Sequence, residues 1–173
     1  MNSADKLRKL IECSEDFLQY NIDNVDYKTI VNNLMELSGA GYIVLNIIDY
    51  DGSVREKIAA VGKLKAINGV TNFRTLEVNN GEKKLGEFIL FFNPDQEIND
   101  CDLLEIYARQ MGMFLERLNQ EKKSRNNDEK FKSYMENSPY AMFVVDFKNG
   151  VISDFNSMAL EMTGYSKEEL FEM

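Results

Sequence analysis

The sequence predicts an α+β fold, in which a four-stranded antiparallel sheet carries helices and a smaller α+β segment follows a long helix. Two stretches predict the sheet, because "YIVLNIIDYDGSVREKIAAVG" and "FRTLEVNNGEKKLGEFILFF" each contain two apolar runs around a turn with glycine. A third observation divides the chain, because "NQEKKSRNNDEK" contains no apolar residue. We therefore expect a first domain at residues 1–118, a polar helical linker at 119–130 and a second domain at 131–173.

Two helices are expected before the sheet. The apolar residues of Ala4–Tyr20 recur close to helical spacing, which predicts an amphipathic helix. Asp26 is a candidate N-cap for a second helix that runs to Leu37. The glycines of "SGAG", at 38–41, predict the end of that helix.

The four strands of the first domain are expected at Tyr42–Ile48, Val54–Val61, Phe73–Val78 and Lys84–Phe92. The first strand and the end of the last, "FILFF", are apolar on nearly both faces, so both are placed centrally and expected to be covered. The second strand begins with charged residues and is placed at an edge. Residues 62–72 form the connector between the two hairpins.

A long helix is expected to begin after Asn99 or Asp100, either of which can act as its N-cap. Its apolar residues form a stripe two heptads long. The stripe consists of Leu104, Tyr107, Met111, Phe114 and Leu118. Two interpretations stay open, because such a stripe either packs on the sheet of its own chain or forms the seam of a homodimer. We take the seam as the prediction for these residues.

In the last segment, strands are expected at Met142–Phe147 and Val151–Phe155, around the turn "KNG". Asn156 is a candidate N-cap for the next helix, and Gly164 suits the position just after its end. Ser166 and Glu169 have the spacing of a capping box for a final helix. We expect these residues to shape the backbone rather than to contact a ligand.

Composition argues against several functions. The chain of 173 residues has a net charge of −9, which disfavours nucleic-acid binding. It contains no histidine, which removes catalytic triads, histidine metal sites and histidine-ligated haem. No catalytic or metal site is therefore expected. Cys13 and Cys101 are far apart in sequence and are expected to be free thiols in a reducing cytoplasm, with a redox switch as the alternative. The longest apolar run is too short to span a membrane.

Three stretches resemble the GAF family of sensory domains in their order and pattern. They are "LMELSGAGYIVLNIIDYDGSVREKIAAVG", "GEKKLGEFILFF" and "DLLEIYARQMGMFLERL". The resemblance implies an exit helix that often pairs with its twin in a dimer. Only 18 residues separate Gly62 from Gly81, where the family usually has a longer segment that builds much of its ligand pocket. The resemblance therefore implies dimerisation and signal relay rather than ligand capture.

The stretch "EKFKSYMENSPYAMFVVDFKNGVISDFNSMALEMTGYSKEEL", at 129–170, resembles the beginning of a PAS domain. A complete PAS domain has further strands and a covering helix, so the resemblance implies that this chain is a fragment of a longer protein, cut inside its PAS module. Haem and flavin are held largely by the missing part in the members that bind them. No cofactor is therefore assigned.

Together the two resemblances imply a cytoplasmic sensory fragment of a signal-transduction protein. Its whole protein is expected to be a homodimeric sensor histidine kinase of a two-component system, with the kinase as output domain in the same polypeptide. Diguanylate cyclases and transcription regulators are the other common outputs. Two further functions stay open. One is a small-molecule receptor with its ligand between the sheet and the connector at 62–72, and the other is a free methionine sulfoxide reductase, which needs clustered cysteines.

Overall fold

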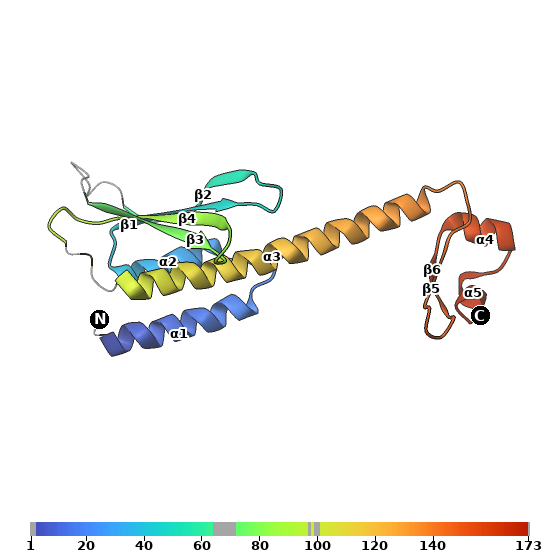
Figure 1. Cartoon of the computed structure of the whole chain (residues 1–173), viewed down its shortest axis with the longest axis horizontal. Helices are drawn as coiled ribbons and strands as arrows, with labels where there is room; N and C mark the ends of the chain where they lie inside the picture. Colours follow the sequence, from blue (N-terminus) through green and yellow to red (C-terminus); the bar gives the residue numbers. More distant parts are fainter. Residues whose placement is uncertain (1–2, 64–71, 97, 99–100, 173) are drawn as a thin grey trace. The chain divides into compact units, whose positions relative to one another are not determined.

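The computed structural model describes residues 3–63, 72–96, 98 and 101–172. The chain separates into two compact units, Met1–Lys122 and Lys123–Met173. The predicted α+β class is confirmed, because each unit combines an antiparallel sheet with helices (Figure 1). The predicted N-cap at 99 or 100 and residues 64–71 of the predicted connector lie outside the described residues.

Two helices precede the sheet, α1 (Ser3–Gln19) and α2 (Tyr27–Ser38). Asp26 caps α2 as predicted, because its carboxylate accepts hydrogen bonds from two backbone N–H groups of the first turn. A hydrogen bond from the Thr29 hydroxyl, together with these backbone bonds, holds the pKa of Asp26 below its ordinary value. Gly39 follows the helix with a φ of 69°, a conformation that glycine adopts without strain.

The sheet of the first unit is antiparallel, with the strand order β2-β1-β4-β3. Its strands are β1 (Tyr42–Ile48), β2 (Val54–Gly62), β3 (Phe73–Asn79) and β4 (Lys84–Phe91). As predicted, β1 and β4 are the central pair, and their register runs from Tyr42 opposite Phe91 to Ile47 opposite Gly86. The strand that begins with charged residues, β2, lies at an edge as predicted.

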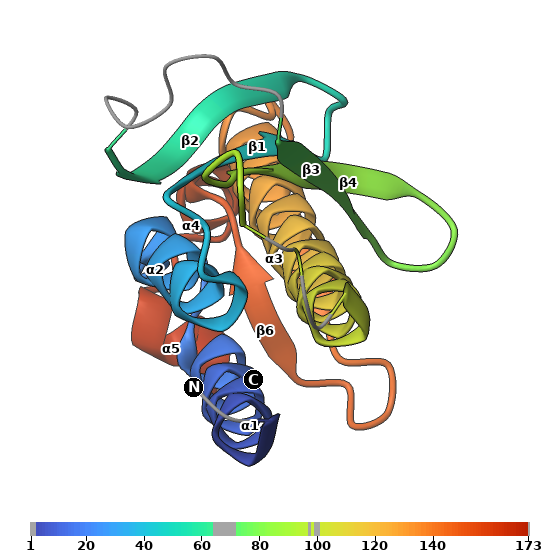
Figure 2. The same cartoon turned by 90° about the vertical axis from the view of Figure 1, so that its left-hand side faces the viewer.

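The two faces of this sheet differ in burial. Alternate residues of the central strands, such as Leu45 and Phe88, are fully buried. Figure 2 shows α1, α2 and helix α3 (Cys101–Glu136) gathered on one side of the sheet. The residues between the buried ones are only half-buried. The expectation of covered central strands therefore holds for the inner face only, because no described helix covers the outer face.

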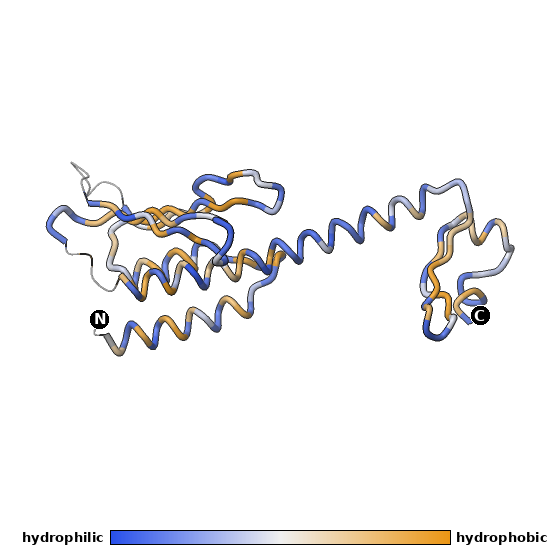
Figure 3. Tube along the Cα trace, in the orientation of Figure 1, coloured by the Kyte–Doolittle hydropathy of each residue, from blue (hydrophilic) through white to orange (hydrophobic). Residues whose placement is uncertain are grey.

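Helix α3 runs without interruption from Cys101 to Glu136 and includes the predicted linker, 119–130. Its first part packs on the inner face of the sheet. From 119 to 134 its side chains are half-buried or exposed, and hydrophilic colours predominate there in Figure 3. At Gly112 the helix meets the end of β3, where an added Cβ would lie 1.9 Å from the carbonyl oxygen of Asn79. Glycine is therefore what allows this close approach.

The second unit contains a hairpin and two short helices after α3. These elements are β5 (Phe143–Val145), β6 (Ile152–Phe155), α4 (Ser157–Thr163) and α5 (Lys167–Phe171). As predicted, Asn156 caps α4 and Gly164 ends it in the left-handed conformation. Ser166 and Glu169 form the predicted capping box. The second unit has a small core of Phe155, Ala159 and Leu170.

Asn156 does more than cap a helix. Its side chain is fully buried, and its oxygen accepts hydrogen bonds from the N–H groups of Met142 and Ala159. Its amide nitrogen donates to the carbonyl oxygens of Met135 and Tyr140, both at 2.9 Å. One buried amide thus joins the end of α3, the segment just before β5 and the start of α4. The sequence predicted only the capping bond.

Candidate functional site

The five residues of the predicted dimer seam lie in the core of the first unit. Leu104, Tyr107, Met111, Phe114 and Leu118 are between 0% and 4% exposed. The ring of Phe17, on α1, lies 5.5 Å from that of Tyr107 and 5.2 Å from that of Phe114, measured between centroids. Of the two interpretations that the sequence left open, packing within the chain is therefore the one observed for these side chains. Dimerisation itself stays a prediction.

A second apolar stripe, which the sequence did not identify as a surface, lies on the outward side of α1 and α3. Its exposed members are Leu7, Ile11 and Leu18 on α1 and Ile106 and Met113 on α3. The spacing was visible in the sequence. However, a helix with two apolar stripes does not reveal which stripe faces the sheet until the tertiary structure is known.

Two polar contacts fix α3 to the neighbouring helices. The hydroxyl of Tyr107 donates a hydrogen bond to the carbonyl oxygen of Ile30 at 2.7 Å, and burial raises the pKa of this tyrosine well above its ordinary value. The guanidinium of Arg117 donates to the carbonyl oxygens of Phe17 and Tyr20, at 2.7 and 2.6 Å. Arg117 thereby satisfies free carbonyls at the end of α1.

A third contact lies where α3 leaves the first unit. The ammonium of Lys122, the last residue of this unit, is 3.1 Å from Oδ1 of Asp49, directly after β1. Asp49 also binds Arg55 of β2, whose Nε lies 2.6 Å from Oδ2. The Asp49 side chain is only 16% exposed, so solvent screens these pairs less than it screens an open surface pair. The β1–β2 hairpin is thus joined to the exit of α3.

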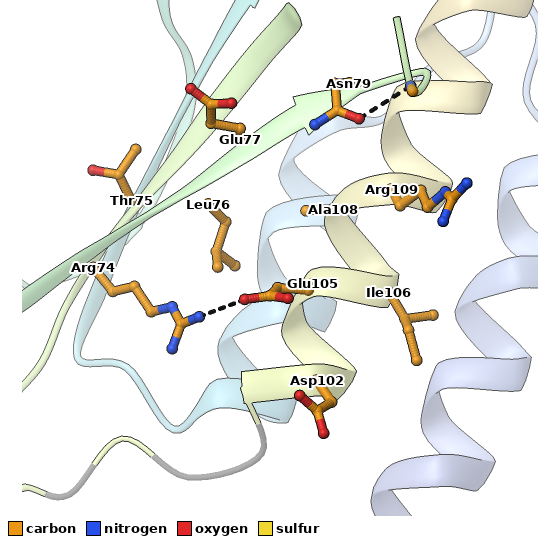
Figure 4. A pocket seen from close by; sticks show the side chains of 11 residues that line it. Arg74, Thr75, Leu76, Glu77, Asn79, Asp102, Glu105, Ile106, Ala108 and Arg109 are labelled. Atoms are coloured by element: carbon orange, nitrogen blue, oxygen red, sulfur yellow. Dashed lines mark hydrogen bonds and ion pairs between the residues drawn. The ribbon is translucent and has the colours of Figure 1, made fainter.

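An open groove of about 770 Å³ lies between the edge strand β3 and α3. Figure 4 shows the ion pair that crosses it, with Nη2 of Arg74 at 2.8 Å from Oε1 of Glu105. Other charged residues of both signs line it, among them Glu77, Asp102 and Arg109. The residues that line this groove include no nucleophile paired with a base. The ion pair instead joins the N-terminal part of α3 to the sheet.

Aromatic side chains form a row on the half-buried outer face of the sheet. The ring centroid of Phe91 lies 5.8 Å from that of Tyr42 and 6.3 Å from that of Phe73. The sequence leaves open a ligand between the sheet and the connector at 62–72, without assigning it to either face. Neither the groove beside β3 nor the groove between α1 and α3 lies on the outer face, and residues 64–71 of the connector are outside the described part.

The two cysteines differ in environment. Cys13 is buried in the core, and this burial raises the pKa of its thiol to about 11, so it is protonated at neutral pH. Cys101 is half-buried, and its sulfur accepts a hydrogen bond from Arg74. Both are free thiols. This arrangement gives no support to a reductase built on clustered cysteines.

Within 3–63, 72–96, 98 and 101–172, no three histidine, cysteine or acidic side chains converge as a metal site requires. In the same ranges, none of the helices combines the length and the apolar character needed to cross a bilayer.

Residues 129–173 match the family model described as PAS fold. Over these residues the second unit is PAS-like. The PAS prediction is thus confirmed for the part of the chain on which it was made, and the caps and hairpin of the second unit are the elements that carried it.

Among solved structures, the chain is similar to "the GAF domain of a putative sensor histidine kinase from Pseudomonas syringae pv. tomato", with 12% identity and a TM-score of 0.49 over 75% of this chain and 94% of that one. It is also similar to a chain of the E. coli DhaR(N)–DhaL complex, with 11% identity and a TM-score of 0.42 over 95% of this chain and 67% of that chain. None of the curated proteins compared matches the sequence. Because both TM-scores are below 0.5, the GAF-like assignment of the first unit rests on its sequence pattern and observed sheet.

Proposed function

We propose that this chain is a signal-relaying part of a homodimeric sensory protein, in which the first unit passes changes in the position of α3 to the PAS unit. One observation carries the proposal: a single helix is a structural part of both units. Up to Leu118, one face of α3 is buried in the core of the first unit. Near its end, Met135 is 4% exposed and its carbonyl oxygen binds the buried Asn156 of the second unit.

The whole protein, in this proposal, is a cytoplasmic sensor histidine kinase of a two-component system, with its kinase as output domain in the same polypeptide. The support is the PAS match of residues 129–173 and the GAF-like pattern of the first unit, which together are typical of such proteins. This chain supplies no catalytic group in the proposal. It transmits a conformational change, which requires that the two units bias a common element.

The polar contacts of α3 suggest how a change enters the helix. A shift of the β1–β2 hairpin moves Asp49, which holds Lys122 at the exit of the first unit. A shift of the edge strand β3 moves Arg74, which binds Glu105 near the start of α3. Two parts of one sheet therefore act on two ends of the same helical segment.

Hydrogen exchange tests the relay. Asp49→Asn keeps the shape of the side chain but removes the charge that binds Lys122, a loss of about 1–3 kcal/mol for a charge-assisted bond. We expect faster exchange in the last turns before 122 and altered exchange within 123–173. Glu36→Gln, which breaks an exposed pair with Lys9 away from α3, is the control. Faster exchange before 122 with no change beyond it would contradict the relay.

The aromatic row on the outer face supports a second candidate, a small-molecule receptor. Half-buried rings of Tyr42 and Phe91 offer stacking surface for a planar apolar ligand. Native mass spectrometry of the purified chain tests this candidate. A stoichiometric metabolite that is lost in Phe91→Ala supports it, and a chain purified without any bound mass argues against it.

A further inference from the structure

The edge strand β3 presents backbone groups that the sheet does not use. At its start, Phe92 donates its N–H to the carbonyl oxygen of Asn72 at 3.0 Å. Hydrogen-bonded positions alternate along an antiparallel pair, so the even-numbered residues of β3 form the ladder to β4. The N–H and C=O groups of Phe73, Thr75 and Glu77 therefore point away from β4. Among the described residues, none pairs with them.

The two edges of the sheet differ in how they are protected. Natural edge strands are blocked by charged side chains, especially lysine, by proline or by bulges. The edge strand β2 has three successive charged residues at 55–57, a left-handed Lys57 with a φ of 50°, and a register shift against β1. In β3, the stretch Phe73–Val78 has no lysine, no proline and no register shift. Of the two edges, β3 is therefore the one that is open to another strand.

The groove of about 770 Å³ lies along this open edge. Its lining includes Thr75 and Glu77, which are exposed on the outer face of the sheet, and Arg74 and Leu76, which alternate with them on the inner face. A groove that reaches residues of both faces runs along the edge of the strand. Helix α3 forms the opposite wall (Figure 4). The groove thus leaves room for a strand beside β3, with its side chains against α3.

The wall formed by α3 carries opposite charges at its two ends. Arg74 binds Glu105, and the end of β3 meets Gly112, so β3 and α3 run in the same direction. Asp102 therefore lies toward the start of β3 and Arg109 toward its end. Neither forms an ion pair within the described part of the chain. They are about 10 Å apart along the helix. The apolar lining of the groove consists of Leu76, Ile106 and Ala108.

We propose that β3 binds an extended peptide segment of a partner protein as a further, antiparallel strand. Only a partner in extended conformation offers N–H and C=O groups at the spacing of the open edge. We assign the antiparallel direction because every pair of this sheet is antiparallel and such pairing is slightly the more stable.

The charges of α3 define the side chains of this peptide. An antiparallel strand enters near Arg109 and leaves near Asp102. Its side chains that face α3 are therefore an acid, an apolar residue and a base, in that order and at alternate positions. Three alternate positions span about 13 Å, which long side chains match to the separation of the two charges. The proposal goes beyond the relay and does not depend on it, because the edge and the groove lie within the first unit.

The first test is an amide NMR titration of the isotope-labelled full chain with the blocked synthetic peptide TETVTKT. Its glutamate, valine and lysine follow the order that the groove requires. We expect shifts confined to 73–77 and 102–109, with slower hydrogen exchange at Phe73, Thr75 and Glu77. The peptide TQTVTQT keeps the strand and loses both charges, so it should bind about fivefold more weakly. The reversed peptide TKTVTET matches the charges only as a parallel strand and should also bind more weakly.

The second test blocks the edge on the protein. Thr75→Pro removes an N–H that points away from β4, which an edge strand tolerates, and places the proline ring against the docking strand. It should abolish the binding of TETVTKT, whereas Thr75→Val keeps the N–H and should bind like the wild type. Far-UV circular dichroism checks that each variant is folded. Arg109→Glu tests the same groove without changing β3 and should weaken binding about tenfold, because repulsion replaces attraction.

Each outcome supports or overturns a defined part of the proposal. Without amide shifts at 73–77 at millimolar TETVTKT, or with equal binding by Thr75→Pro, the docking site is wrong. Equal binding of TQTVTQT overturns the role of Asp102 and Arg109, and tighter binding of TKTVTET overturns the antiparallel direction. Edge amides that are protected without peptide, in a dimer that Thr75→Pro dissociates, would make a second copy of β3 the occupant. None of these results changes exchange within 123–173 in Asp49→Asn, on which the relay is judged.

Discussion

Replacing Gly112 with alanine should destabilise the first unit, although alanine is the better helix former. In a free helix this change adds about 1 kcal/mol of stability. In this structure the new Cβ would lie 1.9 Å from the carbonyl oxygen of Asn79 and 2.4 Å from its carbonyl carbon. Both are backbone atoms at the end of β3, so they cannot rotate away as a flexible side chain would. The helix has to move off the sheet.

The size of the effect follows from two opposing terms. Overpacking a well-packed site costs about 1–3 kcal/mol, and a clash with backbone belongs at the upper end of that range. Subtracting the helix-forming advantage leaves a net loss of about 2 kcal/mol. For a unit of this size, that loss lowers the melting temperature by about 5–10 °C.

Thermal and urea unfolding of the full chain, followed by far-UV circular dichroism, measure this loss, since the chain has no tryptophan to report by fluorescence. Ser124→Ala is the control, because Ser124 is exposed on the same helix and nothing in its surroundings opposes a methyl group. We expect that control to be neutral or slightly stabilising. A Gly112→Ala chain as stable as the wild type would refute the close approach of α3 to β3.

Further predictions concern the buried polar groups of Asn156, Tyr107 and Cys13. Asn156→Ala removes four hydrogen bonds from a fully buried site and should lower the stability of the second unit by about 3 kcal/mol. Hydrogen exchange of the second unit should accelerate in this variant but not in the exposed Lys148→Ala control. Equal exchange rates in the two variants would contradict the predicted loss. Tyr107→Phe removes the hydrogen bond from the Tyr107 hydroxyl to the carbonyl oxygen of Ile30 in α2 and should lower the free energy of unfolding by about 0.5–1.5 kcal/mol in urea titrations. An unchanged midpoint would show that the bond contributes nothing. At pH 8, Cys13 should react with a thiol-specific disulfide reagent far more slowly than Cys101. Because the pKa of Cys13 rises from 9.0 to about 11 on folding, its contribution to stability is full below pH 9 and is lost as the pH rises to 11. Cys13→Ala should therefore flatten the fall in melting temperature over that window, and an unchanged slope would contradict the assignment.

The features predicted correctly from the sequence are those that depend on neighbouring residues. Asp26 caps α2 through N–H groups two and three residues away, and Ser166 with Glu169 closes a capping box within one turn. The central position of β1 and β4 followed from their unbroken apolar character. Because these effects act over a few residues, the local pattern contains the information that determines them.

What the sequence did not reveal depends on contacts between distant residues. Helix α3 carries two apolar stripes, and only packing against α1 and the sheet shows that the stripe from Leu104 to Leu118 faces inward. The pairing of Asp49 with Lys122 joins residues 73 positions apart. The sequence gives no sign that Gly112 lies against the end of β3. No periodic pattern encodes these contacts.

Transmission from the first unit to the second requires that α3 stay helical through residues 119–130. Hydrogen exchange of these amides in the full chain measures their helical protection directly. Amides of an intact helix exchange more slowly than those of an unstructured peptide of the same sequence, even when the side chains are exposed. We expect measurable protection through this segment, lower than that of 104–118. Exchange at the rate of an unstructured chain would mean that the units are joined by a flexible linker and would contradict transmission through the helix.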